Sequence, residues 1–408
     1  MALFRNTLKK LLSSSEATII NLPCLHTRKC NYVNVYMKWK KDSYYDSIPH
    51  ILYSPFLKPI TSLTNIISQY PNACIPVSAV SKRGLELDVP VKVARFLRLY
   101  PSIFEEFVGP QYNHPWFRLT PQALALHEEE RAVYCDRKKD IWMRLKKLIL
   151  MSRGRVLPLR VIQGLRWYLG LPESSFDEGF DSDLGFELVE MEDGEKGLGV
   201  VSDERVLSVM EMNAMEKGTR DDEEGSIEAI EFPLYPSKGL RLKRKIENWI
   251  DEFQKAPYVS PYEDSSNLDP TSDSSEKRVV GVLHELLSLF VEHSAERKKL
   301  LCLRKFLGLP QKFYKAFERH PHIFYLSLRN KTCTAILKQA YNQNSGIEVH
   351  PLLRVRKKYV KLMKESEVIL KNRRMKTRGV HHEDVGLDLD LDSVERDTKL
   401  IWGCKSGN

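Results

Sequence analysis

Apolar residues recur at helical spacing over most of the chain, and Gly, Pro, Ser and Asp separate the runs. The most regular run spans residues 277–291, where one helical stripe carries five large apolar residues: Leu283, Leu286, Leu287, Phe290 and Val291. Similar amphipathic patterns predict further helices at residues 140–150, 240–253, 297–307 and 351–370. The patterning therefore predicts a mainly α fold.

A short pattern, Leu-Arg-x-x-Leu-Gly-Leu-Pro, occurs at residues 165–172 and again at 303–310. In each copy the Gly can end one helix in the left-handed conformation, and the Pro that follows suits the first turn of the next helix. Ser294 is expected to cap the helix that leads into the second copy. Each copy is therefore predicted to form a helix–turn–helix corner.

A longer repeated unit surrounds these corners. It begins with a Pro and an apolar helix. A five-residue pattern follows at residues 100–104 and 320–324: an aromatic residue or His, then Pro, a variable residue, Ile and Phe. We predict this unit at least twice, with a degenerate third copy that ends at residues 184–186. Residues 103–108 and 116–119 are expected to pair as a hairpin. The predicted fold is thus a series of helix–turn–helix units with short β-hairpins, in one extended domain.

Charge is distributed unevenly along the chain. The 63 basic and 54 acidic residues give a net charge of +9. Acidic residues outnumber basic ones by about 15 between residues 173 and 230, so the remainder carries roughly +24. Such a balance suits a polyanion, most often nucleic acid and otherwise an anionic membrane surface. The acidic segment is expected to lie away from the binding surface.

Basic residues gather at residues 36–42, 137–166, 297–305 and 354–378. In the first stretch, aromatic and basic residues interleave, so that Trp39 offers a stacking surface while lysines neutralise phosphate. A packed Trp and solvated charged helix faces are the alternative interpretation. On charge alone, the candidate RNA contacts are Lys38, Trp39, Lys40, Lys41, Arg144, Lys146, Lys147, Arg153, Arg155, Arg160, Arg166, Arg297, Lys298, Lys299, Arg304 and Lys305.

The two ends of the chain differ from its middle. Residues 1–30 are basic and rich in hydroxyl groups, with Phe4, Leu8 and Leu11 on one helical face, which predicts an organellar presequence. The alternative is a frayed first helix. A domain is expected over residues 31–370, with an acidic insertion at about residues 190–230, and a disordered charged tail over residues 371–408. The mitochondrion is the favoured compartment and the chloroplast the alternative.

Several chemistries have no support in the sequence. The seven Cys are scattered without a Cys-x-x-Cys pair, which argues against a disulfide framework and a zinc ribbon. No phosphate-binding Gly-rich loop or hydrolase motif is present, and no apolar run reaches the roughly 20 residues that cross a bilayer. His320 and His322 are expected to pack rather than to bind metal. We therefore predict no enzyme activity, no cofactor and no metal.

Six segments together resemble the plant organelle RNA recognition family, which includes chloroplast and mitochondrial group II intron splicing factors. They are residues 96–105, 115–120, 145–151, 156–159, 169–172 and 297–321. The resemblance covers about residues 32–370, and residues 32–41 are most similar to a mitochondrial branch. The second unit departs from the family pattern, since Ser182-Asp183 replaces Tyr-Pro.

The resemblance implies binding of single-stranded or structured intron RNA and assistance to intron folding, without catalytic residues. The leading hypothesis is therefore an RNA-binding factor for group II intron splicing, with intron RNA and other splicing factors as partners. An organellar DNA-binding factor and a protein scaffold are the alternatives, since helix–turn–helix corners can also dock in a DNA groove. No particular oligomeric state is predicted.

Overall fold

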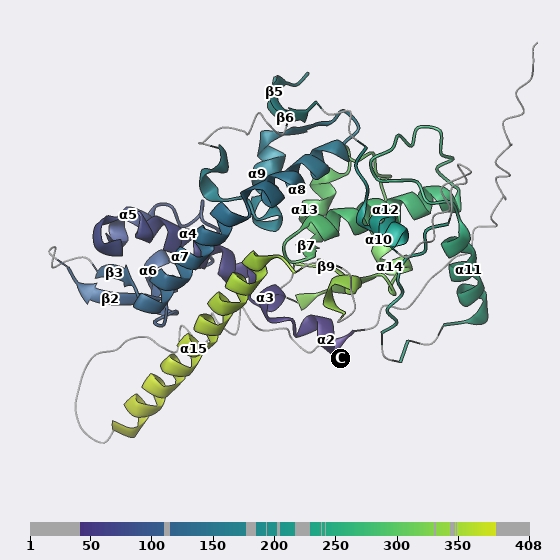
Figure 1. Cartoon of the computed structure of the whole chain (residues 1–408). Helices are drawn as coiled ribbons and strands as arrows, with labels where there is room; N and C mark the ends of the chain where they lie inside the picture. The colour runs from purple at the N-terminus through teal and green to yellow at the C-terminus, as the bar shows by residue number, and fades with distance from the viewer. Residues whose placement is uncertain are drawn as a thin grey trace, which may run out of the picture. The chain divides into compact units, whose positions relative to one another are not determined.

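The structure is a computed structural model, and its described residues belong to one compact unit, residues 34–408 (Figure 1). They are residues 41–109, 115–176, 185–192, 194–201, 205–216, 229–237, 239–240, 242–329, 332–342, 347 and 349–380. The predicted presequence and most of the predicted tail, and with them Lys38, Trp39 and Lys40, lie outside these residues.

Three repeats of one motif make up most of the chain. The first comprises α4 (Ser54–Ser68), η1 (Pro71–Ala73), β1 (Cys74–Pro76), α5 (Val77–Ser81), α6 (Val93–Arg98), β2 (Phe104–Val108) and β3 (Pro115–Leu119). The second comprises α8 (Lys138–Leu150), β4 (Val156–Pro158), α9 (Leu159–Leu169), η2 (Glu173–Phe176), β5 (Phe186–Glu190) and β6 (Lys196–Val200). The third comprises α12 (Asp273–Leu289), β7 (Ser294–Glu296), α13 (Arg297–Leu303), η4 (Phe313–Lys315), α14 (Ala316–Arg319), β8 (Phe324–Ser327) and β9 (Thr334–Leu337).

The remaining elements lie before, between and after the repeats. They are α2 (Ser43–Asp46), α3 (Pro49–Leu52), α7 (Pro121–Asp136), α10 (Val209–Glu216), α11 (Arg244–Lys255), η6 (Lys338–Tyr341) and α15 (Pro351–Val380). The long helix α15 packs against α3, α4 and α7 (Figure 1). Its Tyr359 and Met363 are fully buried among the apolar side chains of the first repeat. This helix therefore completes the core of that repeat.

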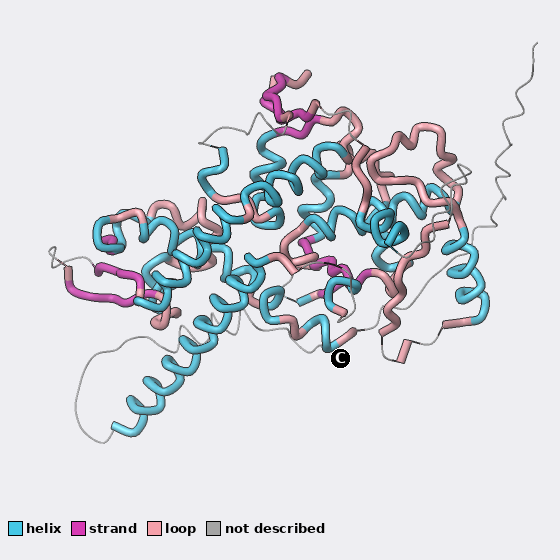
Figure 2. The backbone as a smooth tube through the Cα atoms, viewed as in Figure 1, coloured by secondary structure: helices cyan, strands magenta, loops and turns pink. Residues whose placement is uncertain are grey.

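Each repeat contains one antiparallel sheet in which the last strand lies between the other two (Figure 2). Thirty positions separate the first residue of the first strand from the Phe that opens the second strand: Cys74 and Phe104, Val156 and Phe186, Ser294 and Phe324. Because this spacing is the same in all three repeats, residues from just before the first strand to the start of the second can be matched between repeats without gaps.

The matched positions show what the sequence supplies to the fold. The same inward position of the second helix carries a buried aliphatic side chain in each repeat: Val80, Ile162 and Leu300. The residue before the first strand has positive φ each time: Ala73, Arg155 and His293. The residue before Val-Pro or Leu-Pro also has positive φ: Asp88, Gly170 and Gly308. These shared positions explain why divergent sequences form the same unit.

Most of the predicted elements are confirmed. The degenerate copy is a true second repeat, since Phe186 opens β5. The hairpin at residues 103–119 forms as β2 and β3, and Gly170 ends α9 with φ 76°. The prediction omitted the short first strand of each sheet, because three residues cannot show an alternating pattern. It was wrong at Ser294, which lies in β7, so that Glu296 instead is the N-cap of α13, and this helix ends at Leu303.

Candidate nucleic-acid interface

The second and third repeats pair with each other through equivalent contacts. Arg153 donates its backbone N–H to the carbonyl of Phe306 at 2.9 Å, and Val291 donates to the carbonyl of Tyr168 at 2.7 Å. Arg153 and Val291 each lie three positions before the first strand of their repeat, and Tyr168 matches Phe306. Such a reciprocal exchange is what a local two-fold axis produces. Helices α9 and α13 also contact each other directly (Figure 1).

Two glycines make this close approach possible. A Cβ added at Gly170 would lie 2.7 Å from Cγ2 of Val291, and one added at Gly308 would lie 2.3 Å from Nε of Arg153. Both glycines have positive φ, a backbone conformation that residues other than Gly adopt only at a cost in free energy. The Leu-Gly-Leu-Pro motif thus ends a helix turn and also forms the seam between two repeats.

Six basic residues from both repeats come together around this seam, and we call them the basic face. They are Arg153, Arg160, Lys298, Lys299, Arg304 and Lys305. Lys299 reaches across the helix pair, since its Nζ lies 3.9 Å from the Cβ position of Gly164. Arg160 and Lys298 occupy the same position of α9 and α13, and both are exposed. The structure therefore joins two sets of predicted residues that are about 140 positions apart in sequence.

Most of this charge is available to a ligand. Apart from Arg160, the basic face forms no ion pair with any residue that the structure describes, and Arg153, Lys298 and Lys305 are exposed. The guanidinium of Arg160 lies 2.7 Å from the carboxylate of Glu195, but its side chain is 68% exposed. Mobile basic side chains in water are the usual partners of phosphate groups.

Other predicted contacts have structural partners instead. Arg144 pairs with Asp140 at 2.9 Å and donates to the carbonyl of Leu289. Burial by itself would raise the pKa of Asp140, but contacts with His350 and Arg144 lower this pKa to about 2. The carboxylate is thus ionised at neutral pH and holds Arg144 in the protein.

Arg166 and Lys146 also fit RNA contact poorly. Arg166 donates to Glu173, which in turn accepts hydrogen bonds from Ser62 and Asn65 of α4, so this group ties the first repeat to the second. Lys146 is only 8% exposed, because α8 packs against both α12 and β6. Its selection as an RNA contact is contradicted by its burial.

The other predicted residues are not part of the basic face. Lys41 and Arg155 are exposed, Lys147 is half-buried, and the guanidinium of Arg297 lies over the ring of Tyr314 at 5.5 Å. The expectation that the acidic segment avoids the basic face is wrong at one point, since Glu195 contacts Arg160.

The charge-based selection also missed residues. Lys312 and Lys315 are exposed in the turns that follow α13, close in sequence to the basic face. A signal for them was present, because both lie between the apolar positions of the unit that follows Pro310. They add two exposed basic side chains to the third repeat.

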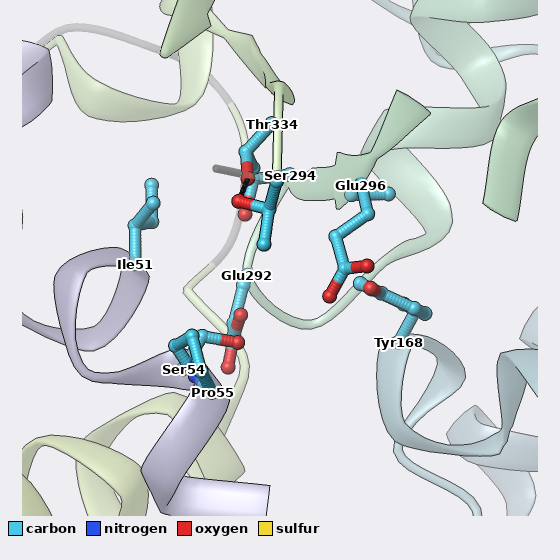
Figure 3. Close-up of a pocket in the computed structure, with 10 residues that line it drawn as sticks. Ile51, Ser54, Pro55, Tyr168, Glu292, Ser294, Glu296 and Thr334 are labelled. Carbon is cyan, nitrogen blue, oxygen red and sulfur yellow. Dashed lines mark hydrogen bonds between the residues drawn. The ribbon is translucent and has the colours of Figure 1, made fainter. Parts of the chain in front are cut away.

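A small pocket near the seam is acidic and structural. Figure 3 shows Tyr168 and Glu296 on one side of it and Ile51 with Ser54 on the other. The amino group of Lys58 lies 3.3 Å from Glu296 and 3.1 Å from the hydroxyl of Tyr168, and buried Arg356 pairs with Glu292 at 3.0 Å. Because these carboxylates already have cationic partners, the pocket does not suit a phosphate.

Two features that other kinds of site would need are absent from the described residues. Within the described ranges, no cluster of three or more His, Cys, Asp or Glu is placed to hold a metal ion. His320 and His322 are buried, and His320 contacts Glu276 at 2.9 Å, which confirms their prediction as packed residues. None of the described helices is both long and apolar enough to span a membrane.

Helical repeats that share an exposed basic surface are the class of structure suited to binding a polyanion. Residues 40–368 match the family model of the plant organelle RNA recognition domain. The chain therefore belongs to the plant organelle RNA recognition family. This is a family of RNA recognition domains and not a family of enzymes.

Several relatives have known names. Protein WHAT'S THIS FACTOR 9, mitochondrial, from Arabidopsis thaliana is 59% identical over 371 residues, which are 89% of this chain and 95% of that protein. Protein WHAT'S THIS FACTOR 1, chloroplastic, from Zea mays is 29% identical over 79% of this chain and 66% of its own length. Protein ROOT PRIMORDIUM DEFECTIVE 1 from Arabidopsis thaliana is 28% identical over 83% of this chain and 85% of its own length. No solved structure matches.

Proposed function

We propose that this protein binds RNA in the mitochondrion and promotes splicing of group II introns by stabilising intron structure. The observation that carries the proposal is the basic face, where two repeats of an RNA recognition domain present Lys and Arg side chains that, apart from Arg160, form no ion pair with any described residue. Residues 1–30 would act as the presequence, in keeping with the mitochondrial relative at 59% identity. The domain that follows, about residues 31–370, would hold the RNA.

The chemistry of this function needs no active site. Lys and Arg neutralise phosphates and release counterions, which supplies affinity without covalent change. A protein that binds a folded intron more tightly than an unfolded one shifts the population toward the folded form. The intron RNA then performs its own splicing reaction. The acid-lined pocket near Tyr168 takes no part in this, since its charges are satisfied internally.

The test is crosslinking of RNA to the tagged full chain in plants, followed by purification from mitochondria and sequencing of the RNA. We expect enrichment of a few intron segments over an untagged control. A Lys298→Ala/Lys305→Ala variant should recover several-fold less RNA, whereas Lys82→Ala/Lys92→Ala, which changes two exposed lysines of the first repeat, should recover the wild-type amount.

Two outcomes would contradict the proposal. Recovery of protein partners that survives nuclease treatment, with no RNA above the control, would indicate a protein scaffold. Enrichment of organellar DNA in place of RNA would indicate the DNA-binding alternative.

A further inference from the structure

We propose that the basic face recognises base-paired RNA, a stem of the intron, rather than a single strand. This inference rests on the proposed function and specifies its substrate. It follows from the local two-fold axis between the second and third repeats, and from the kinds of side chain that surround it.

Arg160 and Lys298 are the pair of residues that shows the local symmetry most simply. They are equivalent residues of α9 and α13, so the local axis relates them and they lie at the same height along it. Both are exposed, and they therefore reach one surface together. A nucleic-acid duplex has dyad axes of its own that exchange its two antiparallel strands, and proteins with two-fold symmetry use this match. Equivalent cations can thus contact equivalent phosphates on the two strands, which a single strand cannot offer.

The aromatic side chains near the seam support the same conclusion. Binding of single strands without a duplex usually depends on exposed aromatic rings that stack on the bases. Here the guanidinium of Arg356 covers the ring of Trp167 at 3.7 Å, and that of Arg297 lies over Tyr314. Among the residues that the structure describes, the aromatic side chains that are largely exposed are Tyr44 and Tyr70, neither of which lies on α9 or α13.

Among the described residues, the face therefore offers phosphate contacts without a largely exposed aromatic ring. This is the pattern by which proteins recognise A-form RNA helices, through backbone shape and 2′-hydroxyl groups rather than through base edges. Glu195 makes the two halves unequal, since by strand register its match in the third repeat is Thr332 and, among the described residues of the basic face, only Arg160 has a carboxylate partner. Lys298 should consequently contribute more to binding than Arg160.

The experiment compares affinities of the full chain for three fluorescent probes. These are a short RNA duplex, one of its strands alone, and a DNA duplex of the same sequence. We expect the RNA duplex to bind at least about tenfold more tightly than either competitor. Arg160→Ala and Lys298→Ala should each weaken duplex binding, by about three- to tenfold, and should flatten its salt dependence.

Lys82→Ala is the matched control, because Lys82 is an exposed lysine at the end of α5, the corresponding helix of the first repeat. It should leave the affinity unchanged, and thermal melts should show that all three variants fold. If the single RNA strand binds as tightly as the RNA duplex or more tightly, the inference is overturned but RNA binding still stands. If the DNA duplex binds as tightly as the RNA duplex or more tightly, the inference is overturned as well. A chain that binds none of the RNA probes would contradict the proposed function itself.

Discussion

The first repeat has the same strand order and spacing as the second and third, yet it does not share their pairing contacts. At the position of Arg153 and Val291, whose N–H groups donate across the seam, it has Pro71, which has no N–H. At the position of Gly170 and Gly308 it has Asp88. The seam therefore depends on a few positions that the fold of a single repeat does not need.

The surfaces differ in the same way. Where α9 and α13 carry Arg160 and Lys298, the first repeat carries Ser78. The exposed Arg83, just after α5, pairs with Glu86 at 3.0 Å. A buried aliphatic position is kept in all three repeats, whereas the outward positions vary. Comparison of internal repeats thus separates residues that form the fold from residues that are available to bind a ligand.

The largest predicted effect is on stability at low pH. It arises because the third repeat contains buried His side chains and the second does not. Burial lowers the pKa of His284, His293 and His322 to about 4, whereas residues 138–200 contain no His. Between pH 6.5 and 4 the unfolded chain binds protons that the folded chain excludes, so stability falls as pH falls, by up to about 1.4 kcal/mol per pH unit for each His. Hydrogen exchange at pH 7 and pH 5, corrected for intrinsic rates, should show the third repeat losing protection first.

The His322→Gln variant is the control for that measurement. It should reduce the loss of stability between pH 7 and pH 5, because one proton-binding group has been removed from the unfolded chain. An equal loss of protection in the second and third repeats would show that buried His does not determine acid sensitivity.

The next largest effect on stability is expected when the third repeat receives, at Val291, the Pro that the first repeat has at the matching position. Val291→Pro removes the N–H that donates to the carbonyl of Tyr168, at a site where Val291 is fully buried. We expect its free energy of unfolding to lie about 2 kcal/mol below that of Val291→Ala, since an unsatisfied buried polar group costs about 1–3 kcal/mol. Urea unfolding of both variants measures this difference, and equal stabilities would mean that the hydrogen bond across the seam is unimportant.

The seam glycines should show a smaller, graded effect. Gly170→Ala meets buried Val291 and Leu352, whereas Gly308→Ala meets the flexible side chain of Arg153. We expect losses of about 2–3 and about 1–2 kcal/mol, because positive φ alone costs about 1–2 kcal/mol and the overlap with packed side chains adds to it. Gly154→Ala is the control, since nothing lies within 4 Å of its added Cβ. Thermal or urea unfolding in which all three variants matched would contradict the close approach of the repeats.

The smallest predicted effect is a gain in affinity. Glu195→Gln removes the carboxylate that pairs with Arg160 and makes the second repeat resemble the third, in which Lys298 has no ion-pair partner among the described residues. We expect RNA affinity to rise about two- to threefold, in line with the weak energies of exposed ion pairs. Fluorescence anisotropy at two salt concentrations measures this, and a fall in affinity would indicate that Glu195 orients Arg160 for binding.

Much of the fold could be predicted from the sequence because helices α8, α11, α12 and α15 have strong amphipathic patterns. The sheets could be predicted only in part. Hairpins leave local turn signals, but β1, β4 and β7 are three residues long and pair with strands far along the chain, as Ile75 does with Phe117. Long-range pairing of short strands has no local pattern.

The site could be predicted even less completely, for a physical reason. Charge density identified the segments that carry the basic face, but a basic residue on a helix can face solvent, a carboxylate or another helix. Lys146 is buried, Arg144 is held by Asp140, and Arg160 is exposed, although all three lie in one basic stretch. The seam that joins residues of two repeats follows from tertiary contacts, which no local pattern encodes.

The central claim is that RNA lies on the face shared by the second and third repeats. Crosslinking of the full chain to a bound intron RNA, followed by mass spectrometry of the modified peptides, tests it most directly. The account predicts crosslinks within residues 151–164 and 297–315, which hold α9, α13 and the adjoining turns. Crosslinks concentrated in the first repeat, residues 54–119, with none in those two segments, would contradict it.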